Sequence, residues 1–194
     1  MDNNTYIVTE KPENVSYDDL YKLIYDANEI NRQRGIRIIT NISNGDDLKR
    51  QFGPSTMIYV VLKNRKLVGT FSVRIEERNQ RFLRGLQTGY MMHLAVISEC
   101  RGQGIGKELV ERIERYGREK HADVLVLYVV DRNPAKKLYS SCGFVPVDFI
   151  ARTKLKQNTV CMVKWLTPCP YPKFMIPLYF KLKQAYVRIR YRYP

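Results

Sequence analysis

The residues of this sequence best suited to chemistry form a glycine-rich turn that begins at Arg101 and ends at Gly106. The turn reads Arg-Gly-Gln-Gly-Ile-Gly, follows an apolar run at 90–97 and opens a helical pattern that continues to about Lys120. N–H groups in the first turn of a helix lack intrahelical partners and carry partial positive charge, so they attract anions. Glycines let an anion approach the backbone, and Arg101 and Lys107 add charge on either side. The turn is therefore a candidate phosphate site, although a surface turn that needs glycine for its conformation reads the same way.

Hydrophobic periodicity predicts the elements that must position this turn. Helical spacing of apolar residues begins after Ser16, a typical N-cap residue with Asp19 three positions on. The run at 124–130 is almost wholly apolar, as in a central strand covered on both faces, and Asn133-Pro134 and Gly143 are start and stop signals of a short helix. The predicted strands are 6–8, 57–62, 67–75, 90–97, 124–130, 144–149 and 159–166, and the predicted helices are 16–30, 47–52, 105–120 and 133–143. This order predicts an α/β fold with a mixed sheet.

Length and composition narrow the class of protein. With 194 residues, 44% of them hydrophobic and 27% charged, the chain fits one soluble globular domain with a sizeable core. It has no run of about 18 apolar residues and no features of a secretory signal at its start, so we expect a cytoplasmic protein without a membrane span. The four cysteines are scattered and only two histidines accompany them, so no metal site is predicted.

The C-terminal end carries most of the net charge of +14. No acidic residue follows Ile150, and from Tyr186 to Tyr193 arginine alternates with apolar or aromatic residues, which is the periodicity of a strand with one basic face. We therefore expect a domain at 1–166 and a basic, Pro/Tyr-rich extension at 167–194. That extension is expected to add a strand, to contact a second copy in a homodimer, or to bind nucleic acid through basic residues interleaved with aromatics.

Two motifs together resemble the signatures of the GNAT N-acetyltransferase superfamily. The pattern Arg101-x-x-Gly104-x-Gly106, preceded by Leu94-Ala95-Val96, resembles its acyl-CoA loop. About thirty residues later, the stretch from Asn133 through Tyr139 to Phe144 resembles the second signature, with an apolar strand between the two. The resemblance covers roughly 6–166. It implies an α/β (α+β) fold with a mixed, splayed central sheet flanked by about four helices, to which the basic extension is added.

The resemblance also implies a role for each site residue. It implies acetyl-CoA as co-substrate and no metal, with the pantetheine arm held beside a strand bulge, the pyrophosphate on the glycine turn and Tyr139 near the thioester sulfur. The implied cofactor-binding residues are Leu94, Ala95, Val96, Arg101, Gly102, Gln103, Gly104, Ile105, Gly106, Lys107 and Asn133. Because a phenol has a pKa of about 10, Tyr139 is a suitable general acid for the departing thiolate.

The sequence departs from the family pattern at the position where many members carry the general base. Many members carry a carboxylate on the strand before the Leu-Ala-Val position, whereas 88–93 here contains none. Because a histidine ordinarily titrates near neutral pH, His93 is a candidate base or proton relay. The alternatives are that His93 is a structural, hydrogen-bonded histidine, that a water chain carries the proton, or that a carboxylate serves, namely Glu76, Glu77, Asp18 or Asp26.

The acceptor is the least specified part of the prediction. Arginines at 32, 34 and 37, and again at 78, 81 and 84, suit an acceptor that bears a carboxylate or phosphate, unless they form a solvated rim. The resemblance implies an N-acetyltransferase that passes the acetyl group of acetyl-CoA directly to a primary amine, on a small molecule or a peptide. The alternative is a nucleic-acid- or ribosome-associated binding module on the same fold, with or without catalysis, because of the basic C-terminal end.

Overall fold

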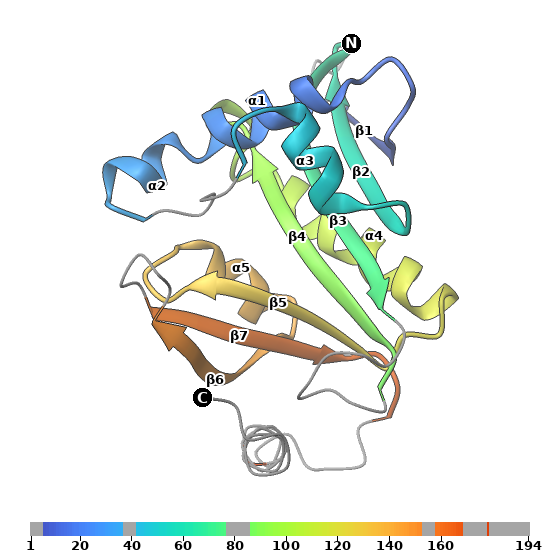
Figure 1. Ribbon diagram of the computed structural model, residues 1–194, viewed down its shortest axis with the longest axis vertical. Coiled ribbons are helices and arrows are strands. Elements are labelled where there is room, and N and C mark those ends of the chain that lie inside the picture. The colour runs from blue at the N-terminus through green and yellow to red at the C-terminus, as the bar shows by residue number, and fades with distance from the viewer. Residues whose placement is uncertain (1–5, 37–41, 77–85, 153–157, 169–177, 179–194) are drawn as a thin grey trace. The chain divides into compact units, whose positions relative to one another are not determined.

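A computed structural model describes residues 6–36, 42–76, 86–152, 158–168 and 178 of the chain (Figure 1). The helices are α1 (Tyr17–Ala27), α2 (Glu29–Gln33), α3 (Gly45–Phe52), α4 (Ile105–Glu119) and α5 (Ala135–Ser141), with a short 3-10 turn, η1 (Ser98–Cys100). The strands are β1 (Tyr6–Glu10), β2 (Thr56–Lys63), β3 (Lys66–Glu76), β4 (Thr88–Val96), β5 (Val124–Val130), β6 (Val145–Arg152) and β7 (Asn158–Trp165). The seven strands predicted between residues 6 and 166 are all present, and the α/β class is confirmed.

The seven strands hydrogen-bond in the order β1-β2-β3-β4-β5-β7-β6. Strands β1 to β3 pair antiparallel, and so do β5 with β7 and β6 with β7. Between β4 and β5 the pairing is parallel and joins Thr88, Gly89 and Tyr90 to the start of β5. The sheet is therefore mixed, as predicted.

The chain divides into two compact units that are not continuous in sequence. The first unit is Met1–Arg74 with Met91–Ile113, and the second is Ile75–Tyr90 with Glu114–Pro194. Strands β3 and β4 and helix α4 each contribute residues to both units. The glycine-rich turn belongs to the first unit, and the motif from Asn133 to Phe144 belongs to the second.

In the first unit, local signals set the start of α1. The Asp19 N–H donates to Ser16 Oγ over 3.0 Å, and the Ser16 N–H donates to Asp19 Oδ2 over 2.9 Å. This reciprocal pair is a capping box, which satisfies N–H groups that the helix itself leaves without partners. The capped helix buries Leu20, Leu23, Ile24 and Ala27, the spacing predicted from the sequence.

The predicted single helix at 16–30 is wrong, because the structure breaks it at Asn28. The buried Asn28 side chain donates to the Ile24 carbonyl over 2.8 Å and accepts from Asn31 Nδ2 over 3.0 Å. An asparagine that bonds local backbone competes with helix continuation. Helix α1 therefore ends at Ala27 and the short α2 begins at Glu29.

The predicted start of the next helix at 47 is also two residues late. Asn44 caps α3 by accepting the Asp47 N–H over 2.9 Å, so the helix begins at Gly45. The Gly45 N–H donates to Asp18 Oδ1 of α1 over 2.8 Å. A Cβ at Gly45 would lie 2.5 Å from the Asp18 nitrogen, so this close approach of two helices requires glycine.

The second unit is built around β5. Val124, Leu125 and Val126 are fully buried, which confirms the prediction of a strand covered on both faces. At the start of α5, Asn133 Oδ1 accepts the Ala135 N–H over 2.9 Å, and Gly143 follows the helix with φ +86. Both ends of this helix therefore follow the cap signals in the sequence.

None of the described helices combines the length and apolarity needed to cross a membrane. Across the described ranges, no group of three or more His, Cys, Asp or Glu side chains is placed to hold a metal ion. The predicted basic strand at 186–193 lies outside the described residues.

Candidate functional site

The glycine-rich turn presents a row of backbone amides. Gly102 and Gly104 have φ of +77 and +83, the left-handed region that favours glycine, although a Cβ at either would meet nothing within 4 Å. On either side, the Arg101 N–H donates to Ser98 O over 3.2 Å and the Lys107 N–H to Gly104 O over 3.0 Å. No described group accepts from the five amides between them, those of Gly102, Gln103, Gly104, Ile105 and Gly106.

This row lies where an anion is favoured. The turn from 101 to 104 is exposed, and α4 begins directly after it at Ile105, which is 1% exposed and anchors the helix in the core. Unpartnered N–H groups at the start of a 15-residue helix carry the positive end of its dipole. The geometry of the turn therefore fits a phosphate group.

The charged side chains at the two ends of the turn, Arg101 and Lys107, both have partners within the protein. Arg101 directs its guanidinium to backbone carbonyls, with Nε 3.0 Å from Val96 O. Lys107 is 66% exposed and lies 3.8 Å from Glu111 in a surface ion pair, which is worth little. The backbone amides are therefore the groups of this turn that are available to an anion.

An unusual backbone conformation occurs inside β4. His93 has φ +56, a left-handed value that is uncommon for a residue with a side chain and rare within a strand. Such a residue costs on the order of 1–3 kcal/mol and recurs at functional sites, often where a bulge re-aims the backbone. The next residues, Leu94 and Val96, are half-buried and Ala95 is buried. The kink thus falls immediately before the predicted pantetheine segment.

The His93 side chain is held by the end of α3. Its Nε2 lies 2.8 Å from Gln51 Oε1, and its ring meets the Phe52 ring edge-on at 5.5 Å. An amide oxygen only accepts, so this contact places the ring proton on Nε2. Burial lowers the pKa of His93 to about 4. His93 is therefore neutral at pH 7 and has the environment of a structural histidine, while its part in proton transfer stays a prediction.

The depressed pKa predicts a pH-dependent loss of stability. Between pH 6.5 and 4 the unfolded chain protonates this imidazole and the folded chain does not, so the free energy of unfolding should fall by about 2–3 kcal/mol as pH decreases through this range. Urea denaturation at several pH values checks this, with His93→Asn as the control because asparagine tolerates left-handed backbone. A difference between the two proteins that stays constant with pH would contradict the assignment.

The carboxylates considered as bases occupy different positions. Asp18 accepts the Gly45 N–H and so holds two helices together. Asp26 is exposed on α1, and Glu76 is half-buried at the end of β3 in the second unit. Glu77 lies outside the described residues.

In the second unit, Tyr139 combines a buried ring with a hydroxyl that no described residue contacts by a hydrogen bond. The residue is 7% exposed, and its ring meets the Phe144 ring edge-on at 6.0 Å. Burial raises the pKa of Tyr139 above its usual value, so the phenol stays protonated. Within the part of the chain that the structure describes, no group hydrogen-bonds its hydroxyl. A buried, protonated phenol with an available hydroxyl is suited to donate a proton.

Asn133 uses part of its amide in the fold. The residue is buried and its Oδ1 accepts the Ala135 N–H, so the oxygen caps α5 and the amide nitrogen is left as a donor. Asn133 and Tyr139 are thereby fixed by one short helix, which confirms the local structure predicted for this motif.

Sequence reasoning missed two pairs of residues, and it did not predict the partner of Arg32. Gln51 and Phe52, which hold His93, gave no signal because their role depends on how α3 packs. The rings of Tyr90 and Tyr128 lie 5.6 Å apart. Tyr90 lies opposite Val126 in the parallel pair, and Tyr128 is two residues further along β5, on the same face of the sheet as Val126. Arg32, expected to suit an anionic acceptor or to lie in a solvated rim, pairs with Glu29.

Comparisons with known proteins agree with these motifs. A family model described as "Acetyltransferase (GNAT) family" matches residues 18–144. The mouse protein "Probable N-acetyltransferase family 8 member 5" is 35% identical over 77 residues, which are 39% of this chain and 31% of that protein. The chain therefore spans about a third of the length of this curated relative.

Solved structures show the same fold at low identity. An acetyltransferase of the GNAT family from Staphylococcus aureus Mu50 matches with a TM-score of 0.66 and 16% identity, over 84% of this chain and 100% of that one. A chain of the NatC complex bound to Gag peptide and CoA matches with a TM-score of 0.64 and 23% identity, over 84% and 99%. Identities this low support the shared fold alone.

Proposed function

Because the chain belongs to the acetyltransferase (GNAT) family, we propose that it transfers the acetyl group of acetyl-CoA directly to a primary amine. The observation that carries the proposal is the row of unpartnered amides from Gly102 to Gly106, which coincides with the acyl-CoA loop of the family pattern. Glycine at 102 and 104 permits the left-handed backbone that this row requires. The same amides are suited to the pyrophosphate of CoA.

The remaining cofactor contacts follow from the two motifs. Backbone groups of Leu94, Ala95 and Val96 are proposed to bond the pantetheine arm, directly after the kink at His93. Asn133 is proposed to donate from its amide nitrogen, since its oxygen already caps α5. The left-handed residue in β4 supports this arrangement, because such a residue interrupts the regular strand backbone next to Leu94.

The chemistry is one acyl transfer without a covalent enzyme intermediate. The amine nitrogen attacks the thioester carbonyl carbon, the C–N bond forms, the C–S bond breaks and CoA leaves as a thiolate. A backbone N–H in β4 polarises the carbonyl, an effect worth on the order of 100-fold in rate. Tyr139 donates a proton to the departing thiolate. Holding amine and thioester together supplies much of the remaining acceleration.

The amine must also lose a proton. His93 is proposed as base or relay through Nδ1, because its Nε2 faces Gln51 and the ring is neutral at pH 7. A carboxylate or a water chain is the competing route, and Glu76 is the half-buried carboxylate among the described candidates. If the acidic limb of the pH–rate profile is unchanged in His93→Asn, the general base is a group other than His93.

The acceptor class is a small-molecule or peptide amine. The chain of the NatC complex was solved with a peptide and CoA, which is a precedent for peptide amines on this fold. A domain at 1–166 with a basic extension at 167–194, a homodimer contact and a cytoplasmic location stay predictions from the sequence. Nothing in the described residues favours the alternative of a nucleic-acid-binding module, since its basis is the basic C-terminal end.

Acetyl-CoA should raise the melting temperature of the protein. At a concentration of about 100 times its Kd, a ligand that binds only the folded state adds about 2.7 kcal/mol, which is on the order of 5–10 °C for a chain of this size. Differential scanning fluorimetry checks this, with adenosine as the control ligand because it lacks the pyrophosphate. No shift at millimolar acetyl-CoA, together with no calorimetric heat of binding, would overturn the proposal.

A thiol-release assay then identifies the acceptor. Amino acids, polyamines, peptides and aminoglycosides are compared at equal concentration with acetyl-CoA, and the CoA thiol is detected as it forms. Mass spectrometry of the product distinguishes acetylation of the amine from hydrolysis of the thioester.

A further inference from the structure

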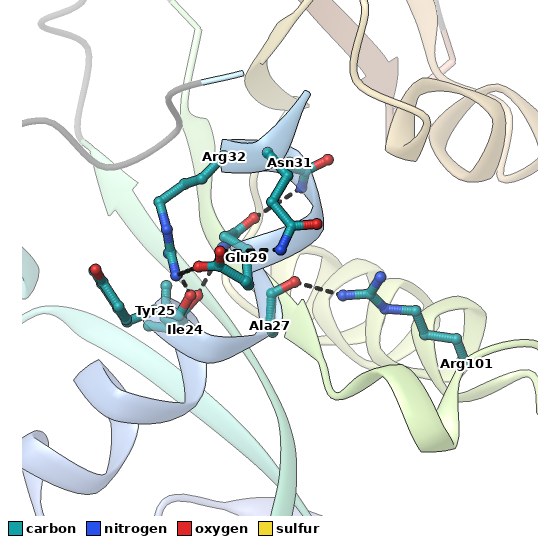
Figure 2. Close-up of polar contacts among 9 residues, drawn as sticks. Ile24, Tyr25, Ala27, Glu29, Asn31, Arg32 and Arg101 are labelled. Carbon is teal, nitrogen blue, oxygen red and sulfur yellow. Dashed lines mark hydrogen bonds and ion pairs between the residues drawn. The ribbon is translucent and has the colours of Figure 1, made fainter. Parts of the chain in front are cut away.

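The C-terminal end of α1 receives hydrogen bonds from three side chains (Figure 2). Asn28 donates to the Ile24 carbonyl, Arg32 to the Tyr25 carbonyl and Arg101 to the Ala27 carbonyl. These carbonyls lie in the last turn, where a helix leaves C=O groups without partners and carries partial negative charge. The last turn of α1 has no basic residue of its own, so its cations come from Arg32 and Arg101.

Arg101 differs from the other two because it comes from a segment 74 residues away in the sequence. Figure 2 shows its side chain reaching the end of α1 from the loop that follows β4. Its Nε donates to Val96 O over 3.0 Å, and a terminal nitrogen donates to Ala27 O. One guanidinium therefore joins the last residue of β4 to the last residue of α1, both in the first unit.

Arg101 also lies at one end of the glycine-rich turn. Arg101 directly precedes Gly102, the first of the two left-handed glycines whose amides were described above. Glycines lose more conformational freedom on ordering than other residues, so a turn rich in them needs anchoring at its ends. Ile105 anchors one end in the core, and the Arg101 side chain anchors the other.

We propose that Arg101 is a positioning residue that ties the anion-binding turn to the α1–α2 junction, defined as residues 27–33. In this arrangement Arg101 holds the backbone amides of residues 102–106 in place for the pyrophosphate. Binding of the pyrophosphate at these amides then also stabilises the α1–α2 junction. The proposal rests on the proposed function, because it takes CoA as the anion. It differs from a direct phosphate ligand, since the guanidinium donates to Val96 O and Ala27 O.

A positioning role and a direct phosphate-binding role predict different effects of Arg101→Lys on the Kd for CoA. Lysine keeps the positive charge, but its single ammonium lacks the planar fork that reaches two carbonyls at once. A positioning role therefore predicts that Arg101→Lys and Arg101→Gln both raise the Kd for CoA about tenfold. A phosphate ligand predicts that only Arg101→Gln does so, and that it also lowers the salt dependence of binding.

Calorimetry on the full chain measures these Kd values at two salt concentrations. The matched control is Arg112→Gln, which removes an arginine from α4 that pairs with Glu108 at 3.6 Å on the surface. This control should leave the Kd unchanged. A wild-type Kd for Arg101→Lys would overturn the proposal.

Hydrogen exchange provides a readout at the junction itself. Without CoA, amides of residues 27–33 should exchange faster in both Arg101 variants than in the wild type. With CoA, their exchange should slow in the wild type and change little in the variants. Equal exchange in wild type and Arg101→Gln would overturn the proposal. Failure of the wild type to bind CoA would overturn the proposed function, while the CoA-free comparison still decides whether Arg101 holds the junction.

Discussion

Replacing Tyr139 with phenylalanine should lower turnover at least about 100-fold and leave the Kd for acetyl-CoA nearly unchanged. The substitution removes the hydroxyl and keeps the ring, which packs edge-on against Phe144. No described residue bonds that hydroxyl, so its loss leaves no buried partner unsatisfied and should not weaken the fold. Thiol release with the best amine of the acceptor assay measures turnover, and calorimetry measures the Kd.

Tyr116→Phe is the matched control for this experiment. Tyr116 is half-buried on α4, where Lys120 lies 5.6 Å from its ring, and it belongs to neither motif. Its substitution should leave turnover unchanged. The raised pKa of Tyr139 further predicts that activity persists at alkaline pH, because the phenol stays protonated beyond its usual range. Unchanged turnover in Tyr139→Phe would remove this residue from the general acid role.

Replacing Gly104 with aspartate should raise the Kd for CoA at least about 100-fold. The new side chain must adopt φ +83, which costs about 1–2 kcal/mol, and it places a carboxylate beside amides that are suited to a phosphate. The open space around the glycine means that no steric clash adds to this effect. The melting temperature should therefore change far less than the affinity.

Gly104→Asn separates backbone strain from charge. Asparagine has nearly the shape of aspartate and tolerates left-handed backbone, so it should raise the Kd only a few-fold. The gap between the two variants should narrow as salt is added, because ions screen the carboxylate. Equal Kd values for both variants would mean that no anion binds at this turn.

Local sequence signals predicted the parts of the site that are held by neighbours in the chain. The capping box at Ser16, the cap at Asn133 and the glycines of the turn each act within a few residues. The run from Val124 to Val130 was predictable because a strand buried on both faces tolerates few polar residues. These signals were enough to place both motifs on the correct elements.

The contacts that depend on packing were not predictable. Gln51 and His93 are 42 residues apart in the sequence, and Arg101 and Ala27 are 74 apart. Contacts at such separations leave no periodic pattern in the sequence from which they could be predicted. The break at Asn28 requires the amide to be buried, which a helical pattern alone does not reveal. The partners of Arg101 and Arg32 were not predictable for a related reason: they are fixed by tertiary structure, and both side chains bond carbonyls of α1.

Because the two units are interleaved along the sequence, the chain cannot be divided between them at one point. The chain passes between them three times, after Arg74, Tyr90 and Ile113. Each passage falls inside a regular element, namely β3, β4 or α4. No single cut in the gene yields either unit whole, and every cut at a passage severs a hydrogen-bonded strand or helix. A truncation at any of these three points therefore removes residues from both units or leaves one of them without a segment.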